Sequence, residues 1–145
     1  MADVQVFRNR TNKSLEAFVA DFTQAAEKRG FALIHQEKSD LVAFYRSHGV
    51  ELPESYKHVM LQICKPQQSG GALLMNPERS LFIQKFVFVY TKEGQTEVRF
   101  LGYSGRLIAD LLGHNSFEND PGDDAFGERL EGTYATMQEM VAEAL

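Results

Sequence analysis

The sequence has one cysteine in 145 residues, four prolines and no long apolar run. A single cysteine cannot form an internal disulfide, so nothing indicates an oxidising compartment. The first residues lack the apolar core of a secretory signal, and no later apolar segment approaches the ~18 residues of a membrane span. With 43% apolar residues, the chain is long enough to bury a core. We expect a soluble cytoplasmic protein, folded as a single domain over residues 1–145.

The sequence also lacks a basic cluster. It carries 15 Lys and Arg against 20 Asp and Glu, a formal net charge of −5, and the acidic residues gather towards the C-terminus. Nucleic-acid binding needs grouped cations that neutralise phosphates. An acidic segment is also repelled by anionic lipids. We therefore expect no nucleic-acid partner and no membrane partner.

The hydrophobic patterns predict an α+β domain. Period-2 or continuous apolar patterns predict strands over residues 4–8, 31–35, 56–64, 81–90 and 95–103. Helical spacing and caps predict helices over residues 15–29, 40–48, 66–76, 107–112 and 128–145, the second one capped by Ser39 or Asp40. Short helices and a closing hairpin favour one mostly antiparallel sheet with helices packed on one face.

Several motifs in the middle of the chain resemble those of the DUF302 family, small bacterial and archaeal proteins of unknown function. The motifs, in order, are Cys64-x-Pro66 at a strand end, Ala72-Leu73 in the next helix, Asn76-Pro77-Glu78, and an apolar strand ending in Val89-Tyr90. The resemblance covers residues 3–103 and implies a two-layer α+β fold with a curved antiparallel sheet. It implies no activity. Residues 104–145 are expected to form a C-terminal helical extension outside the resemblance.

The chain departs from the family pattern at two places. Lys65 stands where members commonly have Asn, and Gln84-Lys85 stands where they commonly have a Pro-Cys pair. If two family cysteines act together, this protein lacks the second one.

Cys64 is the candidate nucleophile. Lys65 is adjacent, and a helix beginning at Pro66 would point its N–H groups towards the thiol, two features that depress the pKa of a cysteine. Catalysis also needs a base. His58 lies six residues earlier on the same strand, about 20 Å away at 3.3 Å per residue, and a pairing with His35 would need tertiary contact. A thiol-dependent enzyme or redox protein is one hypothesis, and a buried structural cysteine is the other.

Other chemical motifs are incomplete. The turn over residues 67–71 could offer N–H groups to an anion, but it lacks the P-loop pattern. No zinc-type spacing of histidines is present. His35 and His58 could be neighbours across the sheet, which leaves a metal or haem site as a further alternative.

The function that we favour from the sequence is a non-catalytic ligand-binding or protein-interaction domain, without an identified cofactor. The expected ligand-binding residues lie on one open sheet face, formed by His58, Met60, Gln62, Cys64, Phe86 and Phe88, or else by the side chains on the opposite face of the same strands. A small molecule or a partner chain would bind there. The final helix could cover this face or dock on a second copy, so a homodimer is also expected.

Overall fold

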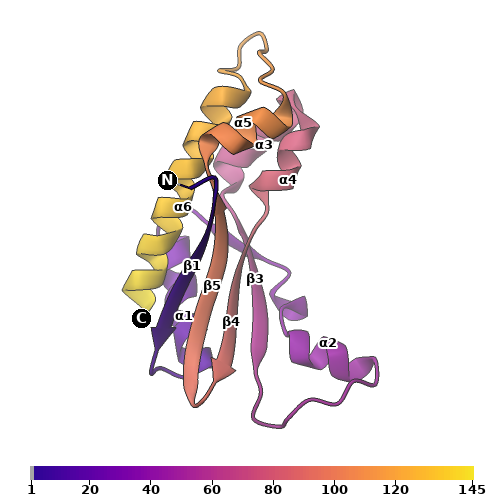
Figure 1. The fold of residues 1–145 in the computed structure, drawn as a ribbon, viewed down its shortest axis with the longest axis vertical. Helices are drawn as coiled ribbons and strands as arrows, with labels where there is room; N and C mark the ends of the chain where they lie inside the picture. Colours follow the sequence, from indigo (N-terminus) through magenta and orange to yellow (C-terminus); the bar gives the residue numbers. More distant parts are fainter. Residues whose placement is uncertain (1) are drawn as a thin grey trace.

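The computed structural model describes residues 2–145 and contains one five-stranded sheet in the order β1–β5–β4–β3–β2 (Figure 1). The strands are β1 (Val4–Thr11), β2 (Ala32–Ile34), β3 (His58–Cys64), β4 (Lys85–Lys92) and β5 (Gln95–Tyr103). Every neighbouring pair is antiparallel. The predicted α+β fold with an antiparallel sheet is confirmed.

Six helices accompany the sheet in the described part of the chain. They are α1 (Leu15–Glu27), α2 (Leu41–Ser47), α3 (Pro66–Met75), α4 (Ser80–Ile83), α5 (Gly105–Leu112) and α6 (Asp123–Ala144). Helices α1 and α6 pack together on one face of the sheet, α3, α4 and α5 gather at one end, and α2 lies beside β3 (Figure 1).

Local sequence signals explain where several elements begin and turn. The side chains of Ser14 and Asp40 accept hydrogen bonds from N–H groups in the first turns of α1 and α2, as N-caps do. Pro66 is the first residue of α3, a position where its missing N–H costs nothing. Gly94 has a φ of 78° in the β4–β5 turn, which favours glycine.

The core lies between the sheet and the layer of α1 and α6. Phe18 and Phe22 of α1, Val87 and Val98 of the sheet, and Met137 of α6 have no exposed surface. Each such side chain contributes about 1.5–3 kcal/mol through burial. Helix α6 is therefore part of the core. It covers the sheet face shared with α1, and not the face that carries His58, Met60 and Phe88, which was one of the two positions expected for it.

Several predicted boundaries were wrong; β1, for example, extends to Thr11 and α5 begins at Gly105, and two further differences affect the elements around the site. Residues 81–83 belong to α4 and not to a strand, because Asn76 accepts a hydrogen bond from the N–H of Glu78 and starts a helical path that continues through α4. Leu81 then faces outward while Ile83 is buried, a pattern that a short apolar run does not reveal. The final helix begins at Asp123, five residues earlier than expected.

Candidate functional site

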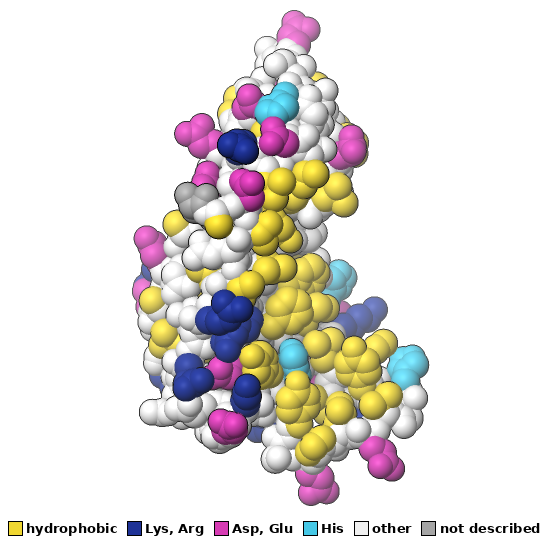
Figure 2. Space-filling model, in the orientation of Figure 1, with side chains coloured by type: hydrophobic (Ala, Val, Ile, Leu, Met, Phe, Trp, Pro, Cys, Tyr) yellow, Lys and Arg dark blue, Asp and Glu magenta, His cyan; other side chains and the backbone are white. Residues whose placement is uncertain are grey.

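The sheet face opposite α1 and α6 is turned towards solvent, and we call it the open face (Figures 1 and 2). The strand register and the alternation of buried residues assign its side chains. They are Val4, Val6, Arg8 and Arg10 on β1, Glu97, Arg99, Leu101 and Tyr103 on β5, Phe86, Phe88 and Tyr90 on β4, and His58, Met60 and Gln62 on β3.

An apolar band crosses the open face, with cations grouped on one side of it (Figure 2). The rings of Phe86 and Phe88 have centroids 6.3 Å apart, and the ring centroid of His58 lies 5.1 Å from that of Tyr90. Aromatic rings at such separations attract one another beyond their shared burial. The half of the face formed by β3 and β4 is therefore an aromatic surface.

The cationic side of the open face is partly neutralised by one carboxylate, that of Glu97. Glu97 accepts hydrogen bonds from Arg10 and Arg99, and these contacts, led by that of Arg10, hold the pKa of Glu97 below its ordinary value. The guanidinium of Arg99 also stacks over the ring of Tyr90, 5.6 Å from its centroid. Two of these cations are thus occupied by contacts within the sheet.

The aromatic half leads into a hollow of about 270 Å³, which we call the apolar hollow. Its lining is mostly aromatic or aliphatic and consists of Leu81, Phe82, Phe86, Phe88, Leu101, Tyr103 and Tyr134, with Gln84 and Lys85 as the polar members. The amide oxygen Oε1 of Gln84 accepts a hydrogen bond from Nε2 of Gln62 at 3.0 Å. This contact leaves the Nε2 donors of Gln84 for another acceptor.

Lys85 is the most unusual side chain at this end of the sheet. It is only 7% exposed, and Nζ donates a hydrogen bond to the carbonyl oxygen of Ile83 at 2.6 Å. Burial lowers the pKa of Lys85 to about 8, while the nearby Cys64 acts in the opposite direction. Lys85 forms no ion pair within the described residues. A buried lysine without a carboxylate partner is rare in proteins.

All six side chains expected on one face share one side of the sheet by strand alternation, but only five of them are partly exposed there, because Cys64 is buried. His58, Met60, Gln62, Phe86 and Phe88 share the open face, and the two phenylalanines also line the apolar hollow.

Cys64, the sixth member, has a different environment. It is the last residue of β3, is 6% exposed, and is not part of the lining of the apolar hollow. It lies close enough to Lys85 for their charges to interact, so the two positions singled out by the family pattern are neighbours in space. No histidine among residues 2–145 forms a hydrogen bond with Cys64.

His35 and His58 form separate environments. His35 follows β2 with a φ of 54°, is exposed, and lies 3.8 Å from the carboxylate of Glu37. His58 instead contacts the hydroxyl of Tyr56, and burial lowers the pKa of its ring. Over residues 2–145, no group of three or more His, Cys, Asp or Glu side chains is arranged to hold a metal ion.

Sequence reasoning missed several members of the apolar hollow. Leu81 was assigned to a strand, and Tyr134 comes from α6, far away in the sequence. The sequence did contain a signal for Leu101 and Tyr103. Side chains alternate along β5, so these two residues point to the sheet face away from the buried Phe100.

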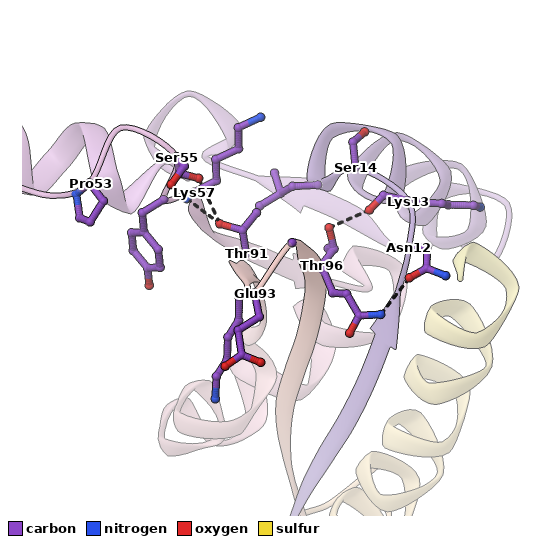
Figure 3. Close-up of a pocket in the computed structure, with 14 residues that line it drawn as sticks. Asn12, Lys13, Ser14, Pro53, Ser55, Lys57, Thr91, Glu93 and Thr96 are labelled. Carbon is purple, nitrogen blue, oxygen red and sulfur yellow. Dashed lines mark hydrogen bonds between the residues drawn. The ribbon is translucent and has the colours of Figure 1, made fainter.

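Another hollow, of about 520 Å³, is a polar cleft at the other end of the sheet (Figure 3). Several of its polar side chains already form hydrogen bonds within the protein. The hydroxyl of Thr91 accepts a hydrogen bond from the N–H of Lys57, the hydroxyl of Thr96 donates one to the carbonyl oxygen of Lys13, and Gln95 donates one to Asn12. These bonds tie the β4–β5 hairpin to its neighbours, and the cleft contains none of the expected site residues.

Comparisons with known proteins support a family and a fold. The family described as "Domain of unknown function DUF302" matches residues 7–141, so it includes α5 and most of α6, which had been expected outside the resemblance. The crystal structure of an uncharacterised conserved DUF302 protein from Bacillus stearothermophilus is similar, with a TM-score of 0.71 and 15% identity over 97% of this chain and 98% of that one. No match was found among curated proteins. Among residues 2–145, no helix is long and apolar enough to span a bilayer.

Proposed function

The chain belongs to the DUF302 family, and for this member we propose a non-catalytic binding function in which the apolar hollow of the open face receives a small, mostly apolar ligand. The observation that carries the proposal is a solvent-facing hollow of about 270 Å³ walled by aromatic side chains at the end of the open face. Ligand sites are typically concave and apolar, with a few polar groups that orient the ligand.

The volume and the chemistry of the lining define the ligand class. Typical ligand pockets measure roughly 300–1,000 Å³, so this hollow suits a compact molecule. Flat rings would stack on Phe86 and Phe88, and a hydrogen-bond acceptor on the ligand would meet the Nε2 donors of Gln84. We therefore expect a compact aromatic or alicyclic molecule that carries an oxygen acceptor.

The wall of the hollow includes exposed apolar surface that a ligand would cover. Leu81 is 73% exposed and Leu101 is 47% exposed. Covering such surface releases about 25 cal/mol per Å² of apolar area, and binding energy would come mainly from this term. A ligand with a charged body would lose that contribution.

Fluorescence titration with the uncharged apolar dye N-phenyl-1-naphthylamine tests the proposal. Leu101→Lys places an ammonium in the wall of the hollow, and Leu111→Lys is the matched control, because Leu111 is an exposed leucine of α5 outside the hollow. We expect Leu101→Lys to weaken dye binding at least ~10-fold, equivalent to about 1.4 kcal/mol, and the control to change it less than ~2-fold. Equal affinities for the two variants would refute the proposal.

The alternatives from the sequence have less support. A thiol-dependent reaction would need access to Cys64, which is 6% exposed. Its test is the rate of alkylation against pH: rapid reaction well below pH 8 would favour thiol chemistry. An alternative role of the open face is to form the interface of a homodimer. Its test is the mass of the protein in solution, which Leu101→Lys would lower from dimer to monomer.

A further inference from the structure

Three cationic side chains from three different elements converge at a second, smaller hollow, which we call the cationic hollow. Lys65 comes from the start of α3, Lys85 from β4, and Arg129 from α6. Gln68 and Ser69 of α3 add an amide and a hydroxyl to the same wall. The three cations are far apart in the sequence, so only the fold brings them together.

The charge of this group is not neutralised by acidic side chains. None of the three cations forms an ion pair within residues 2–145. Lys65 lies over the ring of Phe31 and Arg129 over that of Phe126, contacts that hold these side chains without neutralising them.

Asp120 is an acidic residue whose pKa is lowered in part by one of the three cations, Arg129. Its pKa is lowered first by its hydrogen bond from Arg79, and the charge of Arg129 adds to this effect from beyond ion-pair distance. The carboxylate of Asp120 is therefore already committed to Arg79. In a chain with a formal net charge of −5, a convergence of three unpaired cations is an exception to the overall charge.

Among the three cations of the hollow, Lys85 gives the strongest indication of a bound anion. Its ammonium is buried with a single backbone acceptor, the carbonyl oxygen of Ile83, which also lines the cationic hollow. An ammonium has three donors, so two remain for another acceptor. An anion in the hollow would supply both the missing acceptor and the missing charge.

The backbone at the cationic hollow adds positive potential. Helix α3 is ten residues long and starts with Pro66, and its N-cap residue Lys65 provides no side-chain acceptor for the first N–H groups. The N-terminus of a helix carries a partial positive charge and favours anions. This contribution supports the three side chains but would not define a site without them.

We infer that the cationic hollow is a binding site for a phosphate group, contacted by Lys65, Lys85 and Arg129. The enclosed part of the hollow measures about 20 Å³, enough for one oxygen, so the group inserts one oxygen and leaves the rest at the mouth. Three cations match the two negative charges of a phosphate better than the single charge of a carboxylate. This site shares Lys85 with the lining of the apolar hollow, whereas Lys65 and Arg129 line only the cationic hollow.

Isothermal titration calorimetry at constant ionic strength tests the inference with three probes: inorganic phosphate, glycerol 3-phosphate and acetate. We expect both phosphate probes to bind at least ~10-fold more tightly than acetate. Tighter binding of inorganic phosphate would identify a free ion as the ligand, and tighter binding of glycerol 3-phosphate a phosphomonoester. Equal binding of acetate, or no binding of either phosphate probe, would overturn the inference.

Variants locate the site. Lys85→Met and Arg129→Gln should each weaken phosphate binding at least ~10-fold, and Lys38→Met, which removes an exposed cation outside the hollow, should change it less than ~2-fold. Thermal melting in the absence of phosphate confirms that each variant is folded. Arg129→Gln should leave dye binding at the apolar hollow unchanged, because Arg129 does not line that hollow. Retained phosphate binding in both Lys85→Met and Arg129→Gln would contradict the assignment.

Discussion

A buried ion-pair network joins the segment before α4 to the start of α6, and it provides the sharpest stability prediction. Arg79 is 1% exposed, and Asp123 has no exposed surface. The guanidinium of Arg79 contacts Asp123 at 3.1 Å and Asp120 at 2.9 Å. Asp123 also accepts a hydrogen bond from the N–H of Asn115 at 2.8 Å. The network therefore fixes the two segments that flank the cationic and apolar hollows.

Asp123→Asn keeps the shape of the side chain but removes its charge. Breaking a buried ion pair from one side costs about 3–5 kcal/mol, because the other charge stays buried. Arg79 keeps its two contacts with Asp120, so we expect the lower end, about 3 kcal/mol. An entropy of unfolding near 2.1 cal/mol/K per residue gives roughly 0.3 kcal/mol/K for a chain of this length, and hence a fall in Tm of about 10 °C.

Differential scanning calorimetry at pH 7 measures this effect against Glu118→Gln, which neutralises an exposed carboxylate of the loop before α6. The control should shift the free energy of unfolding by less than ~0.5 kcal/mol. Burial raises the pKa of Asp123, but hydrogen bonds from Asn115, Asn76 and Arg79 outweigh it and hold the pKa below 3.8. The contribution of Asp123 is therefore present at neutral pH and is lost as the pH falls through that lowered pKa, where the variant and the wild type should converge. Equal losses in the two variants at pH 7 would refute the reasoning.

Three further predictions concern packing and titration. In Gly127→Ala the new Cβ would lie 2.4 Å from the backbone oxygen of Gly105, so urea denaturation should show a loss of about 1–3 kcal/mol, whereas Gly132→Ala, with open space around it, should gain roughly 0.5–1 kcal/mol. Burial lowers the pKa of Lys85 from 10.5 to about 8, so wild-type stability should rise by up to about 3 kcal/mol as the pH increases through that interval, and Lys85→Met should show no such rise. Hydrogen bonds that the protonated ring of His114 donates to Asp124 and then to Asp110 raise the pKa of His114. The stabilising contribution of His114 should therefore be present below pH 6.5 and lost as the pH rises through the raised pKa, and an NMR titration of the ring that gives an ordinary pKa would contradict these contacts.

The local features of the fold were predictable from the sequence because they depend on short-range chemistry. The cap at Ser14, the helix start at Pro66 and the hairpin at Gly94 each follow from one residue type in a defined backbone position. The alternation along β3 and β4 likewise placed Met60 and Phe88 on one face, and the register confirms that they are cross-strand partners.

The features that depend on distant contacts were not predictable. Asp123 lies in a run of acidic and turn residues, which is typical of a solvated loop, yet it is completely buried against Arg79, 44 residues away in the chain. Lys85 was visible only as a departure from the family pattern. Its burial, its proximity to Cys64 and its place beside Arg129 result from the tertiary fold, which brings residues of β4 and α6 to the same hollow and which a single sequence does not specify.

The most direct test of the central claim, that the open face binds a small apolar ligand, is an NMR titration of the labelled protein with the uncharged dye N-phenyl-1-naphthylamine. Binding in the apolar hollow predicts that the largest chemical-shift changes occur at Phe86, Phe88, Leu101 and Tyr103. Changes confined to the polar cleft around residues 91–96, or spread over the surface without a centre, would contradict the claim.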